Sequence, residues 1–202
     1  MDEDVLRAML KWPNVPALFG WLQLDRRGNW HIQDQRVDRD ALVAFIGRNY
    51  AHDEQGRWYF QNGPQRGYVA LEYTPWVLRA QLDGTLQTHT GLEVRQVAAG
   101  FIDENGSLLL SFDDNVGLLT DTDLDWAIAR FQRCDGRPVD DVGIGEALEQ
   151  LQSGTPADLA LHYQGKPVPL TYLHSDEVPV RFGFVREPTP GEGGEAAGAQ
   201  RT

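Results

Sequence analysis

The sequence predicts an α+β protein dominated by antiparallel, strand-rich sheets, with a few short helices. Short segments that alternate apolar and polar residues recur along the chain, and Gly, Asn and Asp turns separate them. Apolar stripes at helical spacing are fewer and shorter. With 202 residues, of which 41% are hydrophobic, the chain is long enough to bury a core without disulfides or metals.

The first quarter of the chain predicts a helix, a hairpin and a second helix. Residues 4–11 carry Val5 and Met9 at helical spacing, and Trp12-Pro13 would end that helix. Residues 18–24 and 28–33 alternate as strands on either side of a turn at residues 25–28. Asp38 is a candidate N-cap for a helix through Asn49. Its stripe has the spacing of a helix with one buried face: Leu42, Phe45, Ile46 and Tyr50.

The rest of the chain predicts hairpins and two more short helices. Turn-like sequences separate three pairs of strands: 57–61 with 67–73, 76–82 with 85–90, and 92–102 with 107–112. Thr120 or Asp121 would cap a helix that carries Leu124, Ile128 and Phe131. Another helix is expected near residues 144–151, followed by strands at 158–163, 168–174 and 178–185.

Two stretches share one plan, a hairpin followed by a helix, which predicts two related repeats. They are residues 20–50, with Gly28 in the turn, and residues 100–132, with Gly106 in the turn. The alternative is that this combination is simply a common way to cover a sheet. The predicted division is a strand-rich half over 1–97, an acidic half over 98–187 and a disordered tail over 188–202.

Charge separates the two halves. The chain carries 18 Lys and Arg against 30 Asp and Glu, a formal net charge of -12. Residues 1–96 hold 11 basic and 12 acidic residues, whereas residues 97–202 hold 7 and 18. This balance argues against binding to nucleic acid or to anionic membranes, both of which need a basic surface. It is consistent with a solvated acidic surface, or with an acidic part that recruits a basic partner.

We expect a cytoplasmic location. The N-terminus is acidic where a signal peptide is basic, and no apolar run is long enough to span a membrane. The single cysteine, Cys134, has no partner for an internal disulfide, which suits a reducing compartment. The neighbouring Asp135 would raise the pKa of its thiol rather than activate it.

Several segments resemble an uncharacterised bacterial family, domain of unknown function 1285, or a sister family of it. The similar segments, which span about residues 12–120, are Trp12-Pro13 with residues 20–31, residues 37–45, 56–60, 71–77 and 109–117. The chain departs from the family at Asn62-Gly63-Pro64-Gln65-Arg66, where Thr-Pro-Val-Glu is usual. The resemblance implies a fold of repeated strand-rich motifs and a suggested signalling or ligand-sensing role. It brings no catalytic residues.

No catalytic or metal-binding motif emerges from the sequence, and no cofactor is predicted. The five histidines share no metal-ligand spacing, and His31 and His89 are interpreted as satisfied or solvent-facing residues of strands. Residues 121–125 imitate the start of a calcium loop but lack its glycine and its final glutamate, so capping of a helix explains these acids better. The Gly143-Ile144-Gly145 sequence lacks the third glycine of a dinucleotide loop.

We interpret the protein as a ligand- or partner-binding module, rather than an enzyme, that acts in signalling or regulation. Aromatic and arginine residues of the first half would contact an unknown protein or a small anionic ligand. The candidate contacts are Arg36, Arg39, Trp76 and Arg79. One alternative is a hydrolase whose carboxylates converge only in the folded chain. The other is a structural homo-oligomer, such as a homodimer joined through a sheet edge.

Overall fold

The computed structural model describes residues 1–12 and 15–190 and divides the chain into two compact units. The first unit is Met1–Pro75 together with Gly183–Thr202, and the second is Trp76–Phe182. The chain therefore leaves the first unit once and returns to it. Most of the predicted disordered tail, residues 191–202, lies outside the described residues, as does Pro13.

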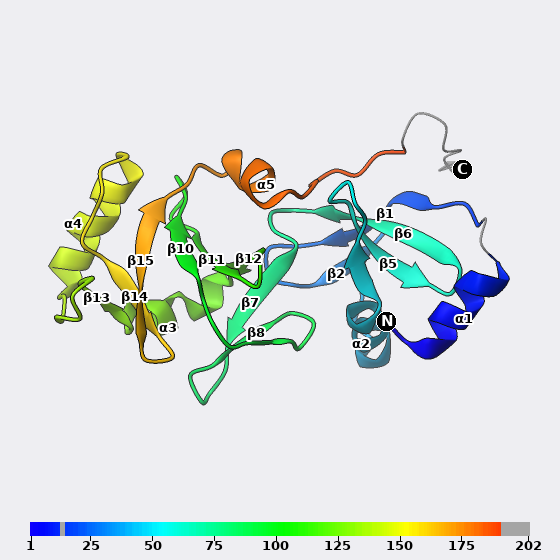
Figure 1. Ribbon diagram of the computed structural model, residues 1–202, viewed down its shortest axis with the longest axis horizontal. Coiled ribbons are helices and arrows are strands. Elements are labelled where there is room, and N and C mark those ends of the chain that lie inside the picture. The colour runs from blue at the N-terminus through cyan, green and yellow to red at the C-terminus, as the bar shows by residue number, and fades with distance from the viewer. Residues whose placement is uncertain (13–14, 191–202) are drawn as a thin grey trace. The chain divides into compact units, whose positions relative to one another are not determined.

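The first unit contains one mixed sheet and two helices (Figure 1). Its elements are α1 (Glu3–Lys11), β1 (Leu18–Leu24), β2 (Trp30–Ile32), β3 (Gln35–Arg36), α2 (Asp40–Arg48), β4 (Tyr50–His52), β5 (Trp58–Asn62) and β6 (Gln65–Leu71). The strand order is β3-β2-β1-β6-β5-β4. All neighbours are antiparallel except the central pair, β1 and β6, which is parallel.

The two faces of this sheet differ in chemistry. Helix α2 covers the apolar face, where Phe45 contacts the ring of Phe60 with centroids 5.4 Å apart. The fully or almost fully buried side chains of this core are Leu22, Leu24, Trp30, Ile46, Trp58, Val69 and Leu71. Because side chains alternate along a strand, the residues between them point to the opposite face. That face carries Gln23 of β1, His31 of β2 and Arg36 of β3.

The returning segment after Gly183 joins the first unit through its backbone. Val185 N–H donates to the carbonyl of Gly56, and Leu71 N–H donates to that of Arg186. Tyr73 is buried, with the guanidinium of Arg26 4.5 Å from its ring centroid and that of Arg186 at 4.8 Å. These contacts fix the segment beside β6.

The second unit is built on a nine-stranded sheet with the order β13-β14-β15-β10-β11-β12-β7-β8-β9. The strands are β7 (Trp76–Ala80), β8 (Leu86–Thr88), β9 (Glu93–Val94), β10 (Ala99–Ile102), β11 (Leu108–Phe112), β12 (Asn115–Leu119), β13 (Phe131–Gln132), β14 (Ala160–Tyr163) and β15 (Lys166–Tyr172). The helices are the 3-10 turn η1 (Asp121–Asp123), α3 (Leu124–Ile128), α4 (Asp141–Gln152) and α5 (Glu177–Phe182). The α+β fold class is thus confirmed.

The predicted hairpins are confirmed, and the backbone conformation of their turns explains why glycine occurs at a fixed position in them. Five turns bring a glycine with φ near +80° to the fourth position after the strand: Gly28 (+77°), Gly56 (+73°), Gly84 (+86°), Gly106 (+76°) and Gly136 (+86°). In the turns that begin at Asp25, Asp53 and Asp103, the carboxylate accepts hydrogen bonds from the backbone N–H groups two and four residues later. The aspartate carboxylate therefore stabilises each turn through hydrogen bonds to the backbone of that same turn.

One predicted strand is wrong. Residues 178–185 alternate apolar residues, but Glu177–Phe182 form α5. Pro179 is acceptable in the first turn of a helix, where its missing N–H costs nothing. Gly183, with φ +65°, then ends the helix. The alternation of apolar residues in this segment therefore reflects side-chain packing and not pairing with another strand.

Other boundaries also change. The strand predicted over 92–102 is interrupted, since only residues 93–94 and 99–102 are paired. The helix predicted to carry Phe131 ends at Ile128, and Phe131 begins β13. Arg39, not Asp38, occupies the N-cap of α2, and Asp38 instead lies 3.5 Å from the Arg36 guanidinium.

The two sheets share an arrangement of six strands. The order β4-β5-β6-β1-β2-β3 in the first unit matches β13-β14-β15-β10-β11-β12 in the second, and β1/β6 and β10/β15 are both parallel pairs. A common origin for residues 20–50 and 100–132 stays a prediction. The unit boundary after Pro75 differs from the predicted one after residue 97, because β12 pairs with β7 and so ties β7, β8 and β9 to the later strands.

Candidate functional site

A row of polar side chains crosses the face of the first sheet that α2 leaves open. Gln23 on β1 pairs with His31 on β2, and His31 pairs with Arg36 on β3. Directly paired residues project to the same face, so these three side chains, here called the polar row, lie next to one another. The Arg36 side chain is 62% exposed and that of His31 is 25% exposed. Arg36 borders the sheet edge, since β3 is the outermost strand.

Asp25 orients His31 from the turn between β1 and β2. Its Oδ2 lies 2.9 Å from His31 Nε2 and also accepts a hydrogen bond from Asn29 Nδ2 at 2.9 Å. Its Oδ1 accepts the backbone N–H groups of Arg27 and Asn29 at 2.9 and 2.8 Å. An ionised Asp25 therefore holds the proton of the neutral imidazole on Nε2. His31 Nδ1 makes no hydrogen bond within the part of the chain that the structure describes.

Hydrogen bonds keep the carboxyl group of Asp25 ionised. Burial by itself would raise the pKa of Asp25, but the hydrogen bonds from Asn29, His31 and the Arg27 backbone outweigh burial and lower the pKa below its ordinary value. The carboxylate is therefore ionised at neutral pH.

Aromatic side chains continue this face toward the centre of the sheet. Trp21, two residues before Gln23 on β1, is 36% exposed. Phe19 stacks on Tyr68 with ring centroids 4.5 Å apart and planes 9° from parallel. Tyr68 is buried, so Trp21 is the exposed ring that accompanies the cationic and amide groups of the polar row, a composition that suits recognition of a polar partner.

A second polar cluster on the same face is internally satisfied. Asp53 Oδ2 lies 2.7 Å from Arg57 Nη2 and accepts the Tyr68 hydroxyl at 3.0 Å. Burial is the largest cause that raises the pKa of Tyr68, and the hydrogen bond to Asp53 adds to it. Because each charge already has a close partner, this cluster is structural.

The predicted contact residues are distributed over both units. Arg36 belongs to the polar row, and its ion pair with Asp38 is long and exposed, so it stabilises little and leaves the guanidinium accessible. Arg39 begins α2, the helix on the other face of the sheet. Trp76 and Arg79 lie in the second unit on opposite faces of β7, as their odd spacing requires. Trp76 is buried and donates to Asn115 Oδ1 at 3.1 Å.

Sequence reasoning missed Asp25, Gln23 and the role of His31. The available signal was an aspartate that opens a hairpin turn six residues before a histidine on the returning strand. A hairpin brings those positions together, but only the register shows that Arg36 joins them.

Ser175, His174 and Glu104 lie close together in the second unit but are not arranged as a nucleophile with its base. The Ser175 hydroxyl donates to Glu104, while His174 Nε2 lies 4.0 Å from that carboxylate, so the histidine is not placed to deprotonate the serine. Within residues 1–12 and 15–190, no group of three or more His, Cys, Asp or Glu side chains could hold a metal ion. None of the helices in those residues has the length and apolar character that crossing a membrane requires.

Fold and open face together define an α+β protein of two strand-rich units that exposes a polar and aromatic sheet surface. The chain belongs to the family described as "Protein of unknown function (DUF2946)", whose model matches residues 1–189. A search of curated proteins found no significant match.

The fold is also similar to solved structures of the DUF1285 family. The protein from Silicibacter pomeroyi DSS-3 is 15% identical with a TM-score of 0.51, over 85% of this chain and 90% of that one. The protein from Shewanella baltica OS155 is 11% identical with a TM-score of 0.41, over 54% of this chain and 91% of that one. The predicted resemblance is confirmed, and the Silicibacter protein shows that it extends to the fold of most of the chain.

Proposed function

We propose that this protein is a binding module that holds an acidic segment of a partner protein on the open face of its first sheet. The observation that carries the proposal is the polar row, in which Arg36 and His31 are cross-strand neighbours and Asp25 orients His31. Arg36 supplies a fixed positive charge, and the imidazole of His31, held by Asp25, lies beside it. The amide of Gln23 adds donors and an acceptor beside them.

The shape of the surface favours a protein segment over a small molecule. The row follows a sheet face at an edge strand, whereas small-molecule sites are concave and bury most of the ligand. Trp21 adds apolar area beside the charges, as protein interfaces commonly do. An extended acidic segment that lies along the edge strand β3 can place a carboxylate over Arg36.

The hydrolase alternative lacks a supporting observation. The Asp25–His31 pair has the geometry of a base and its orienting acid, but the polar row itself contains no Ser, Thr or Cys for the base to activate. Reversible binding of a partner would give the protein a role in signalling or regulation. Exposed Cys134, the chain's one cysteine, fits the expected reducing cytoplasm.

Two charge reversals of the same type test the proposal. The probe is a short synthetic peptide that alternates Glu with Leu, and a Lys–Leu peptide is its charge-reversed control. We expect Arg36→Glu to weaken binding of the acidic peptide by about tenfold or more, because a charged hydrogen bond is lost and a repulsion gained. Arg39→Glu makes the same change in net charge at the start of α2 and should leave affinity within about twofold. Equal losses for the two variants would overturn the assignment.

The self-association alternative is separated by a size measurement. A constant mass across a concentration series in sedimentation would count against a structural homodimer. A concentration-dependent dimer that Arg36→Glu leaves intact would instead show that the open face is not the dimer surface.

A further inference from the structure

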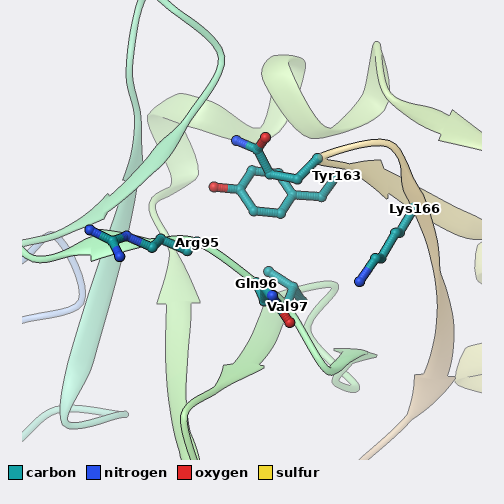
Figure 2. Close-up of a pocket in the computed structure, with 6 residues that line it drawn as sticks. Arg95, Gln96, Val97, Tyr163 and Lys166 are labelled. Atoms are coloured by element: carbon teal, nitrogen blue, oxygen red, sulfur yellow. The ribbon is translucent and has the colours of Figure 1, made fainter.

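The second unit contains a small hollow with a composition unlike that of the unit around it. The hollow has a volume of about 150 Å³ and is lined by Arg95, Gln96, Val97, Tyr163, Gln164 and Lys166. The first three residues belong to the irregular segment between β9 and β10, and the others to the end of β14, its turn and the start of β15 (Figure 2). Two chain segments that are distant in sequence therefore build one hollow.

We propose that this hollow binds a small oxyanion, a carboxylate or phosphate of a few heavy atoms, with Lys166 as its principal charge. The second unit carries 7 Lys and Arg against 17 Asp and Glu, yet two of those cations and none of the acids line the hollow. In so acidic a unit, a lining without carboxylates is a local exception that favours an anion over a cation.

Lys166 is the cation that remains for a ligand. Other cations of the unit are engaged: Arg133 and Arg137 contact Asp158 and Asp135, while Arg130 and Arg181 stack on Trp126 and Phe101. Within residues 76–182, all of which the structure describes, Lys166 has no hydrogen bond or ion pair through its amino group. Its side chain points toward Gln96 and Val97 in Figure 2, whereas that of Arg95 points away from it.

The remaining lining defines how an anion would be held. Gln96 and Gln164 each carry an amide that can donate hydrogen bonds to oxygen. The Tyr163 hydroxyl is already used, since it donates to the Val94 carbonyl and accepts from Leu86 N–H at 3.0 Å. Tyr163 therefore forms a rigid wall, only 3% exposed, and Lys166 is its cross-strand partner in the β14–β15 hairpin. The side chain of Lys166 therefore starts next to the buried and hydrogen-bonded Tyr163.

Volume limits the ligand. A hollow of about 150 Å³ has room for a group of a few heavy atoms. Inorganic phosphate and acetate are therefore suitable probes of the shared chemistry. A preference for one of them distinguishes a phosphate site from a carboxylate site.

The chain provides an internal control, because Lys11 and Lys166 are its only lysines. Reductive methylation with ¹³C-formaldehyde keeps the charge of both amines and gives each a separate NMR signal. At constant pH and ionic strength, with chloride as the balancing ion, phosphate or acetate should shift the Lys166 signal to saturation and leave that of Lys11 unchanged. In unmodified protein, the backbone amides of Gln96 and Gln164 should move with the same dissociation constant.

Variants complete the test. Lys166→Gln should weaken the response of the Gln96 and Gln164 amides by about tenfold or more, whereas Lys11→Gln should leave it unchanged. Saturable shifts at Lys166 that match those at Lys11, or amide shifts that survive Lys166→Gln, would overturn the proposal. So would the absence of any shift with either anion. None of these results bears on the polar row of the first unit, which is tested separately.

Discussion

The carboxylate of Asp25 lies 2.9 Å from Nε2 of His31 while its second oxygen accepts two backbone N–H groups of its own turn. One aspartate thus closes a hairpin and sets the orientation of a histidine on the open face of the sheet. The same turn chemistry recurs at Asp53 and Asp103, but the second oxygen of Asp53 binds Arg57 and Tyr68. Asp25 therefore both stabilises the first hairpin turn and orients a residue of the candidate binding surface.

Asp25→Asn should change the tautomer of His31 without opening the hairpin. The amide oxygen can still accept the N–H groups of Arg27 and Asn29, but its NH₂ group would face His31 Nε2 as a donor. We expect the neutral imidazole proton to move from Nε2 to Nδ1, which long-range ¹H–¹⁵N spectra of the imidazole detect. An unchanged tautomer would mean that Asp25 does not set the protonation site.

Glu104 should make the second unit less stable in acid. Burial alone would raise the pKa of Glu104, but hydrogen bonds from the hydroxyl and backbone N–H of Ser175 lower it from 4.5 to about 2. A folded-state pKa below the unfolded value contributes stability that is fully present above about 4.5 and is lost as pH falls through about 2. The contribution is about 1–2 kcal/mol after discounting for the solvent screening of a side chain that is 31% exposed.

Glu104→Gln checks this account. In urea unfolding between pH 2 and pH 7, the variant should be less stable than the parent at pH 7, and the difference should shrink toward pH 2. A difference that is constant with pH would show that the carboxylate charge is not what stabilises the contact with Ser175.

Gly56 should tolerate no side chain. It has φ +73°, and a Cβ at this position would lie 2.0 Å from the carbonyl oxygen of Gly183. Gly56→Ala must therefore displace the returning segment that Val185 and Leu71 hold by backbone hydrogen bonds. Gly20 is a matched control in the same unit, since it has φ +70° and nothing within 4 Å of the added carbon.

Both glycine variants should lose about 1–2 kcal/mol to left-handed backbone strain, and Gly56→Ala about 2 kcal/mol more through the collision. Denaturant unfolding measures both losses. Hydrogen exchange at Leu71 and Val185 should accelerate in the Gly56 variant alone. Equal destabilisation of the two would mean that the close approach to Gly183 is not a constraint.

Cys134 should react slowly with thiol reagents. Partial burial of the sulfur is the first cause that raises the thiol pKa, and the Asp158 carboxylate is the next, with Asp135 a smaller contributor. The predicted direction for this cysteine is borne out, although Asp158 matters more than the neighbouring Asp135. Asp158→Asn should therefore speed alkylation near pH 8 more than Asp135→Asn does, because the thiolate is the reactive form. The reverse ranking would contradict the assignment.

Local patterns predicted most elements of this fold. The stripe of α2 and the Asp-Gly and Asn-Gly turns are encoded within a few residues, so periodicity and turn chemistry reveal them. The parallel pairs β1/β6 and β10/β15 join strands that are distant in sequence, and no local pattern encodes them. The helix α5 was missed for a related reason, because an apolar alternation over six residues fits a strand as well as a buried helical turn.

The candidate site was predictable only in part. The sequence indicates Arg36 as a cation among aromatic residues, but its neighbours depend on the register of β2 with both β1 and β3. A one-residue shift in that register would place His31 on the apolar face. Arg39 is three residues from Arg36 in sequence yet starts the helix that covers the opposite face, which sequence spacing alone could not separate.

The most direct test of the central claim is to locate the acidic Glu–Leu peptide on the isotopically labelled protein by its effect on backbone amide signals. If the polar row binds the peptide, the largest shifts will cluster on β1, β2 and β3 around Gln23, His31 and Arg36, and they will fade as salt screens the charges. They should also be lost in Arg36→Glu and retained in Arg39→Glu. Shifts concentrated elsewhere on the chain, or unchanged by Arg36→Glu, would contradict a binding function for the polar row.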